Sequence, residues 1–343
     1  IRLELPKEGE NPYACASDIL KMWQDKGILK IEDKPAIYIY EEEFSVGNTR
    51  KSIKGIIARV QLEEFSKGII LPHEFTLSKA KEDRLNLMKA TNCNFSQIYA
   101  LYMDEKHTTL ATIDEQSKAK ADLEFTDETG VTHRLWIETD EEIIAKLVAD
   151  FADRKLYIAD GHHRYETALN YRNYCRENGI SKPGDPQDFQ MIYLVDMEHP
   201  GLVVFPTHRL VRDLPNFDKE AVLEKCSEFF YIDEKEGTGT MEEDLKKLYD
   251  EGKKAFGFYC GKGEWFLLTL KNIDIMSQML PNVSKASQSL DVSVLHTLIL
   301  EKIFGIDKEN MAKQINLTYT KFFTEAIGGV DKGEFQCSFV LNP

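Results

Sequence analysis

The sequence contains no apolar run close to the roughly 20 residues that a membrane-spanning helix needs, which argues against a transmembrane protein. It also contains no internal repeat and no low-complexity tract. A disordered chain is excluded as well, because 19 Phe, 14 Tyr and 3 Trp are too many large apolar side chains. The 343 residues therefore predict a folded, soluble protein, and at roughly 150 residues per domain they predict two domains.

The chain has fewer positively than negatively charged side chains, with 43 Lys and Arg against 58 Asp and Glu. The net charge of -15 argues against a nucleic-acid partner, since an acidic surface repels phosphates. The six cysteines form no C-x-x-C pair and no zinc spacing, which favours reduced thiols in the cytoplasm. No secretory signal opens the chain. Because the first residue is Ile1 and not Met, we expect the numbering to begin inside a longer polypeptide.

Familiar catalytic and nucleotide-binding motifs are missing. The chain has no G-x-x-x-x-G-K-[ST] loop, no G-x-G-x-x-G after a strand and no G-x-S-x-G elbow. The stretch Gly261-Lys262-Gly263 is better interpreted as a hairpin turn. A ligand site must therefore be sought in less familiar patterns.

The pattern of apolar residues predicts a mixed α/β (α+β) fold. Helices are expected at 12–26, 81–90, 140–151, 165–175, 219–230, 241–249 and 292–304. Strands are expected at 36–40, 55–60, 97–103, 133–136, 155–159, 191–195, 202–206, 255–259, 265–270, 315–320 and 335–341. A shift in composition near Leu214-Pro215-Asn216 predicts a boundary between a domain at 1–214 and a smaller α/β domain at 215–343.

The stretch Asp160-Gly161-His162-His163-Arg164 is predicted to be a turn that leads from a strand into a helix. Backbone N–H groups at a helix N-terminus favour an anion, and glycine lets the backbone approach it closely. Arg164 can hold phosphate oxygens with two N–H groups, and His162 or His163 can stabilise a transferring phosphoryl group or move a proton. Asp160 can accept a proton or hold Mg²⁺.

Two other interpretations of this stretch stay open. A β-turn with Asp160 as the helix N-cap explains the Asp and the Gly, but not the two histidines and the arginine. A metal site is the third interpretation, although adjacent histidines point in different directions and the H-E-x-x-H pattern is absent.

Two further loops carry candidate residues. His73 and Glu74 follow an apolar strand, where a Glu beside a His can serve as a general base. Thr207, His208 and Arg209 follow the strand expected at 202–206, where a Thr hydroxyl and two basic side chains could bind phosphate. The alternative is that both are ordinary loops with solvated charges.

The segments IADGHHRYETALNYR, LPHEFTLSKAKEDRL and FPTHRLV closely resemble a bacterial and archaeal family of unassigned activity, domain of unknown function 1015. The resemblance extends over nearly the whole chain and includes LDVSVLHTLILEKIFGI and the closing FVLNP. Members of that family usually have an additional N-terminal segment and a C-terminal extension.

Gly161-His162-His163-Arg164 is also similar to the G-x-x-R turn of the more distant ParB/sulfiredoxin-like superfamily. The likeness implies a ParB/sulfiredoxin-like core in the first domain, with Gly161 and Arg164 binding nucleotide phosphates. It further implies that His162 or His163 faces the transferred phosphate. Some members of that superfamily phosphorylate free L-serine with ATP or ADP, and here Glu74 or Asp160 would accept the hydroxyl proton.

These observations favour a nucleotide-dependent phosphotransferase acting on a small hydroxyl metabolite, with free serine as a candidate. Its expected ligands are ATP or ADP, Mg²⁺ and a small-molecule substrate. One alternative is a hydrolase of a small phosphate ester, which would release phosphate without any nucleotide. Another is a non-catalytic nucleotide-binding module, which would bind tightly without turnover.

Overall fold

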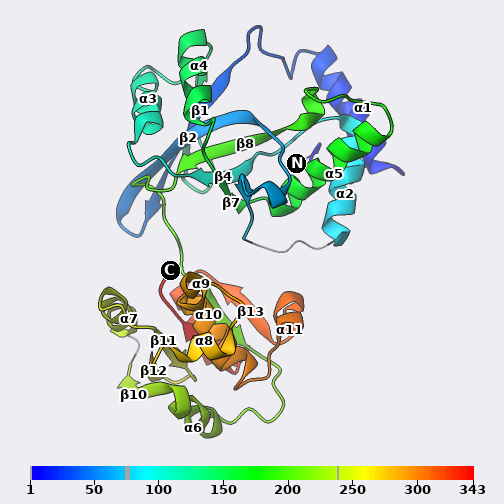
Figure 1. Cartoon of the computed structure of the whole chain (residues 1–343). Coiled ribbons are helices and arrows are strands. Elements are labelled where there is room, and N and C mark those ends of the chain that lie inside the picture. Colours follow the sequence, from blue (N-terminus) through cyan, green and yellow to red (C-terminus); the bar gives the residue numbers. More distant parts are fainter. Residues whose placement is uncertain (1, 74–77, 238) are drawn as a thin grey trace. The chain divides into compact units, whose positions relative to one another are not determined.

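The computed structural model describes residues 2–73, 78–237 and 239–343. The chain divides into two compact units, Ile1–Leu202 and Val203–Pro343. The sequence predicts the boundary later, between residues 214 and 215. The difference arises from strand β9 (His208–Val211), which pairs with β13 (Leu317–Thr320) and β14 (Cys337–Val340) in the sheet of the second unit. Both units mix helices and strands, so the predicted α/β class is confirmed (Figure 1).

The first unit contains an eight-stranded sheet in the order β3-β7-β4-β8-β2-β1-β6-β5. Its strands are β1 (Ile37–Val46), β2 (Thr49–Gln61), β3 (Ile70–Leu71), β4 (Ile98–Tyr102), β5 (Leu123–Thr126), β6 (Thr132–Glu138), β7 (Leu156–Asp160) and β8 (Phe189–Asp196). Its helices are α1 (Pro12–Asp25), α2 (Ser78–Thr91), α3 (Thr108–Gln116), α4 (Glu141–Asp150) and α5 (His162–Glu177), with short 3-10 turns at Phe65–Lys67 and Pro186–Asp188. None of the described helices, in either unit, has the length and apolar character needed to cross a membrane.

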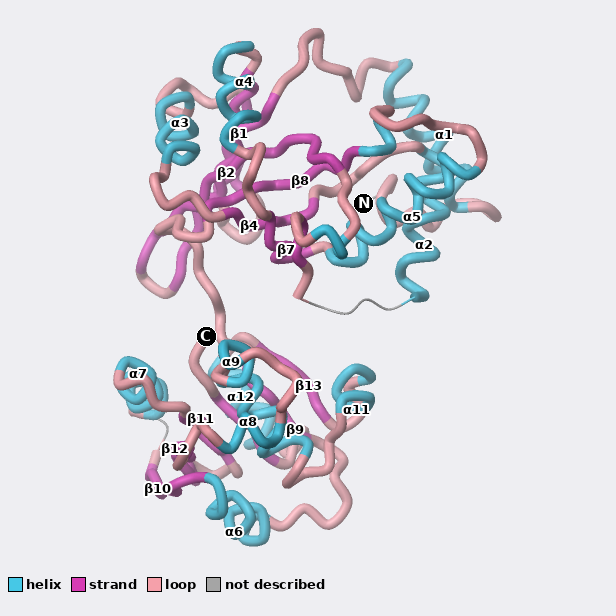
Figure 2. The backbone as a smooth tube through the Cα atoms, in the orientation of Figure 1, coloured by secondary structure: helices cyan, strands magenta, loops and turns pink. Residues whose placement is uncertain are grey.

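Side chains alternate between the two faces of this sheet, because successive strand residues point in opposite directions. Ile39, Ile56 and Ile158 point into one buried cluster, which also contains Leu147 of α4 and Leu169 of α5. Figure 2 shows the helices and strands of this unit separately by colour. Helices α4 and α5 therefore pack against the sheet through this cluster.

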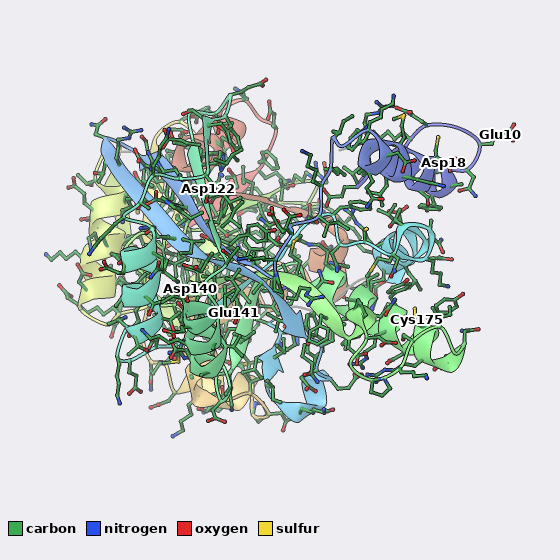
Figure 3. The ribbon with its side chains drawn as sticks, turned by 90° about the horizontal axis from the view of Figure 1, so that it is seen from above. Glu10, Asp18, Asp122, Asp140, Glu141 and Cys175 are labelled. Atoms are coloured by element: carbon green, nitrogen blue, oxygen red, sulfur yellow. The ribbon has the colours of Figure 1, made fainter. Side chains whose placement is uncertain are left out.

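Local sequence signals explain where several elements begin. The Asp140 carboxylate accepts hydrogen bonds from the backbone N–H groups of Glu142 and Ile143, and it thereby caps α4. Figure 3 labels Asp140 and Glu141 at this helix start. On β6, Trp136 is buried and Arg134 forms ion pairs with glutamates on neighbouring strands.

The second unit contains a six-stranded sheet in the order β10-β12-β11-β14-β9-β13. In addition to β9, β13 and β14, its strands are β10 (Phe230–Glu236), β11 (Ala255–Tyr259) and β12 (Glu264–Leu270). Its helices are α6 (Lys219–Phe229), α7 (Met241–Asp250), α8 (Ile275–Met279), α9 (Lys285–Gln288), α10 (Asp291–Val294), α11 (Lys308–Lys313) and α12 (Phe323–Asp331). Directly after α10 the chain forms a π-helix, Leu295–Glu301.

Three sequence predictions about local structure need correction. The strand expected at 202–206 is not formed, and β9 begins only at His208. Val204 and Phe205 are largely exposed, so their β-propensity is not supported by packing against a partner strand. The helix expected at 292–304 is α10 followed by the π-helix. The turn expected at 160–164 is shorter, because α5 begins at His162.

Candidate functional site

The candidate site begins with two neighbouring strands of the first unit. Strands β3 and β7 are parallel, with Ile70 opposite Leu156 and Leu71 opposite Tyr157. The chain continues from β3 toward α2 and from β7 into α5. Because the strands are parallel, their carboxyl ends lie at the same edge of the sheet, which is where ligands gather in α/β folds.

Helices α2 and α5 run parallel, side by side (Figure 2). Near their beginnings, Lys81 Nζ lies 2.5 Å from Glu166 Oε2. Two turns later, Lys89 Nζ lies 4.0 Å from the centre of the Tyr174 ring. Both contacts join residues with the same separation in sequence, so the two helices advance in the same direction. Their N-termini therefore lie at the same end, and the positive ends of two helix dipoles come together.

Gly161 forms the entire link between β7 and α5. Its φ of 96° and ψ of 26° are left-handed, a conformation that glycine adopts without the steric cost of a Cβ atom. A Cβ atom here would also lie 3.0 Å from the guanidinium carbon of Arg164. Asp160 is the last residue of β7, so the helix N-cap is Gly161 and not Asp160. A single left-handed residue is enough to change the chain direction, and no longer turn is needed.

The structure brings His73 and His162 together. The backbone N–H of His73 donates a hydrogen bond to Nε2 of His162 over 3.2 Å, and the two rings are nearly perpendicular with centres 4.5 Å apart. His162 is buried, whereas His73 is exposed. When His162 is neutral, its proton must reside on Nδ1, because Nε2 accepts the hydrogen bond. The end of β3 is thus joined directly to the first turn of α5.

His163 and Tyr165 complete the first turn of α5. The carbonyl oxygen of His163 accepts a hydrogen bond from the Thr167 hydroxyl at 2.6 Å. Tyr165 is fully buried, and its hydroxyl donates to the carbonyl oxygen of Glu63 at 2.8 Å. Burial raises the pKa of Tyr165 to about 12. This side chain anchors the start of the helix and is not a proton carrier near neutral pH.

Arg164 already has acceptors on the protein. Its Nη2 lies 2.5 Å from Oδ2 of Asp160, and its Nη1 donates to the carbonyl oxygen of Gln97. The Asp160 side chain is 75% exposed, so its ion pair with Arg164 can exchange readily with a ligand or with water. Arg164 and Asp160 therefore offer one charge of each sign at the edge where the two helices begin.

Cavities follow the flank of α5. A small one of about 40 Å³ is lined by Arg164, Thr167 and Arg84, among others. A larger one of about 720 Å³ includes Tyr171, Asn92, Arg59, Tyr38 and Phe189 in its lining. The two share Met88, Cys93 and Asn94, and the larger is within the size range of small-molecule sites.

One residue of the sequence-predicted site, Glu74, lies outside the described residues. Within the described ranges, no group of three His, Cys, Asp or Glu side chains is arranged to hold a metal ion. Mg²⁺ commonly binds through one or two carboxylates together with substrate phosphates, and it needs no such preformed group.

Thr207, His208 and Arg209 belong to the second unit, so the structure does not bring them into one unit with the α5 segment. His208 and Arg209 lie on β9 and are only 2% and 6% exposed. Nδ1 of His208 accepts a hydrogen bond from the backbone N–H of Leu341 at 3.4 Å. Burial and the Arg209 charge lower the pKa of His208 to about 4. These two side chains are buried in their own unit and are not solvated charges in a loop.

Sequence reasoning missed Lys81 and the parallel packing of α2 and α5. The available signal was a lysine in the first turn of a predicted helix, where the helix dipole is unfavourable for a cation. An acidic partner or an anionic ligand is the ordinary reason for such a placement. Here Glu166 supplies the acidic partner.

The chain matches a family model described as "Protein of unknown function (DUF1015)" over residues 1–293. Among solved structures, a conserved hypothetical protein from Pyrococcus furiosus is 15% identical with a TM-score of 0.36, and the match covers 83% of this chain and 79% of that one. A free serine kinase in complex with AMP is 14% identical with a TM-score of 0.34, covering 83% and 76%. A variant of a free serine kinase in complex with ADP is 14% identical with a TM-score of 0.28, covering 83% and 87%. No curated protein matches the chain.

Proposed function

The chain belongs to the DUF1015 family of proteins of unknown function, and from the start of helices α2 and α5 we propose that it is a nucleotide-dependent phosphotransferase. The observation that carries the proposal is the meeting of two parallel helices at the carboxyl ends of two parallel strands. Helix N-termini bind anions through free N–H groups and through their dipoles. Two such termini, together with Lys81 and Arg164, suit the polyphosphate of a nucleotide.

Each residue of the site has a role in this proposal. Gly161 lets the phosphates approach the backbone of α5. Arg164 binds phosphate oxygens after exchanging its contact with Asp160. His162 and His163 line the position of the phosphoryl group that is transferred. The cavities along α5 leave room for the nucleoside.

The transfer itself requires a base and a leaving group. The acceptor hydroxyl oxygen attacks the terminal phosphorus of the nucleotide, and the bond from that phosphorus to the bridging oxygen breaks. The remaining nucleotide leaves with that oxygen, while the hydroxyl proton passes to a carboxylate. Asp160, which lies within the described residues, is the first candidate for this base, and Glu74 is the second. Mg²⁺ would neutralise the phosphate charge, because phosphoryl transfer depends mainly on positioning and electrostatics.

The proposed substrate is a small hydroxyl metabolite, with free serine as the first to test. Support comes from the likeness of Gly161-His162-His163-Arg164 to the G-x-x-R turn of the ParB/sulfiredoxin-like superfamily, some members of which phosphorylate serine. A ParB/sulfiredoxin-like core in the first unit is part of the same proposal.

Isothermal titration calorimetry of the full chain with ATP, ADP and CTP, each with and without Mg²⁺, tests the proposal. We expect Arg164→Ala to weaken nucleotide binding at least tenfold. Arg50→Ala removes the same charge from the β1–β2 hairpin, where Arg50 is largely exposed, and should leave binding unchanged. Nucleotide binding in the unmodified protein would justify an acceptor screen that begins with serine.

Two results would overturn the proposal. One is the absence of binding for all three nucleotides in the unmodified chain. The other is equal binding in the Arg164→Ala and Arg50→Ala variants. Phosphate release from small esters without any nucleotide would favour the hydrolase, and nucleotide binding without transfer to any acceptor would favour a binding module.

A further inference from the structure

The second unit contains a buried arginine in an unusual environment. Arg209 lies on β9, opposite Phe339 of β14 and Tyr319 of β13, and it is only 6% exposed. Phe339 is fully buried in the main apolar cluster of the unit. The guanidinium thus lies at the margin of an apolar core, where an ordinary surface arginine would not be found.

The guanidinium has few acceptors for its five N–H groups. Nη1 donates to the carbonyl oxygen of Thr207, and Nη2 lies 3.1 Å from Nε2 of His296. The guanidinium carbon lies 5.3 Å from the centre of the Tyr319 ring. Among the residues that the structure describes, Arg209 forms no ion pair with a carboxylate, and its buried Nε has no hydrogen-bond partner.

The cluster therefore carries an uncompensated positive charge. Burial lowers the pKa of Arg209 to about 10, so the guanidinium stays charged at neutral pH. Burial, followed by the charge of Arg209, lowers the pKa of His296 to about 4, so this imidazole is neutral there. A buried charge is costly unless it is paired and hydrogen-bonded. A bound anion would lower this cost.

His296 is placed by irregular backbone. It lies in the π-helix Leu295–Glu301, and π-helical turns often occur at functional sites. Its Nε2 accepts the hydrogen bond from Arg209, which assigns the proton of the neutral ring to Nδ1. The neutral imidazole therefore holds one arm of the guanidinium through Nε2.

We propose that Arg209, positioned by His296, forms an oxyanion-binding site in the second unit that takes a phosphate or carboxylate group of a small molecule. Arginine suits both groups, because its planar fork matches two oxygens at once. The unused N–H groups of Arg209 donate to the anion, while Nε2 of His296 and the Tyr319 ring hold the guanidinium in place. The site goes beyond the proposed phosphotransferase and does not depend on the start of α5.

Thermal unfolding of the full chain, followed by scanning calorimetry, tests this site. The buffer contains no oxyanion, and inorganic phosphate or acetate is added against sodium chloride of equal ionic strength. We expect phosphate, acetate or both to raise the unfolding temperature by several degrees in a saturable way. The anion with the larger effect at equal concentration identifies the group that the site prefers.

Variants separate this site from the site at α5. Arg209→Met keeps the apolar stem but removes the charge, so it should remove most of the rise with oxyanion and raise the unfolding temperature without oxyanion. Arg212 lies on the same chain segment, and its side chain is 43% exposed. The Arg212→Met variant should therefore keep the rise in unfolding temperature. Arg164→Ala should keep it as well. His296→Leu should reduce the rise and serves as the second test if Arg209→Met does not fold.

Three results would overturn the proposal. In the first, both anions stabilise the unmodified chain no more than sodium chloride does. In the second, the rise persists in the Arg209→Met and His296→Leu variants. Loss of the rise in Arg164→Ala alone would assign the effect to the start of α5 and would also exclude the Arg209 site.

Discussion

Two arginines, one in each unit, show how differently a positive charge can be held. Arg164 lies in the first turn of α5, is one-quarter exposed, and pairs with the exposed carboxylate of Asp160. Arg209 lies on β9, is only 6% exposed, and contacts a neutral histidine, a carbonyl oxygen and an aromatic ring. The first charge is balanced by the protein and can exchange partners, whereas no described carboxylate balances the second.

The fold should gain different amounts of stability from an anion bound at each of the two arginines. An anion at Arg164 must compete with Asp160, so part of its binding energy replaces an existing ion pair. An anion at Arg209 supplies the first counter-charge and relieves a desolvation cost. Binding at Arg209 should therefore change the stability of the fold more than binding at Arg164, which is suited to a ligand that is bound and released in each turnover.

The largest expected effect concerns buried basic groups of the second unit. His208 has a pKa of about 4 in the folded chain, because of burial and the Arg209 charge, and about 6.5 when unfolded. Below pH 6.5 the unfolded chain binds a proton that the folded chain does not bind, so stability falls as the pH drops to 4. Linkage gives a loss of roughly 3 kcal/mol. His208→Asn keeps an acceptor for the Leu341 N–H and should remove this loss, as measured by urea unfolding from pH 7 to 4.

His107 provides the matched comparison in the first unit. It is half exposed, and a hydrogen bond from its ring to the Asp196 carboxylate raises its pKa. Its contribution is complete below pH 6.5 and is lost as the pH rises through the folded pKa. His107→Asn should therefore alter the pH dependence with the opposite sign. Identical pH profiles for the unmodified chain and His208→Asn would contradict the burial argument.

The next effect tests the link between β7 and α5. Gly161→Ala should lower the free energy of unfolding by about 1 kcal/mol, because φ at this position is left-handed. Nucleotide affinity should fall at least tenfold, since the new methyl group displaces the Arg164 guanidinium. Chemical unfolding and calorimetry measure the two quantities.

Gly179→Ala is the control for Gly161→Ala. Its φ of 68° is also left-handed, but a Cβ atom there would meet nothing within 4 Å. Gly179→Ala should therefore lose similar stability and keep nucleotide binding. Full nucleotide affinity in Gly161→Ala would mean that the ligand does not use the first turn of α5.

A smaller effect concerns the ion pair of Arg164 with Asp160, which balances the charge of this arginine. Asp160→Asn removes the competitor for Arg164, so inorganic phosphate without Mg²⁺ should bind several-fold more tightly. Stability should change by less than about 1 kcal/mol, because the ion pair is exposed. Glu177→Gln changes the same charge at the other end of α5 and controls for net charge. Weaker phosphate binding in Asp160→Asn would show that Asp160 does not compete with the ligand.

Local features of the fold follow from the sequence, whereas contacts between distant segments do not. Helix α4 and strand β11 are recovered almost to the residue, because a capping Asp140 and a short apolar run are local signals. The strand expected at 202–206 was wrong, since Val and Phe form a strand only where a partner strand covers them. The strand that does form in this part of the chain, β9, begins only at His208, which the sequence does not indicate as the start of a strand.

The candidate site divides in the same way. The Gly-His-His-Arg pattern was visible because it is continuous, and its place at a helix start was predictable from the flanking strand. The contact of His73 with His162 depends on a two-residue strand, β3, which has no recognisable pattern of its own. Arg209 and His296 lie far apart in sequence and meet only through the sheet and the π-helix, so neither residue alone predicts the pair.

The smallest effect concerns the ion pair that aligns the two helices. Lys81→Met should lower the free energy of unfolding by less than about 1 kcal/mol, because the Lys81–Glu166 pair is partly exposed. Nucleotide affinity should still fall several-fold, since a positive charge is lost beside two helix N-termini. Lys89→Met, on the same helix and over the Tyr174 ring, changes the same charge two turns away and should leave affinity nearly unchanged. If both variants weaken nucleotide binding equally, the phosphates interact only with the net charge of α2, and the start of the helices has no special role.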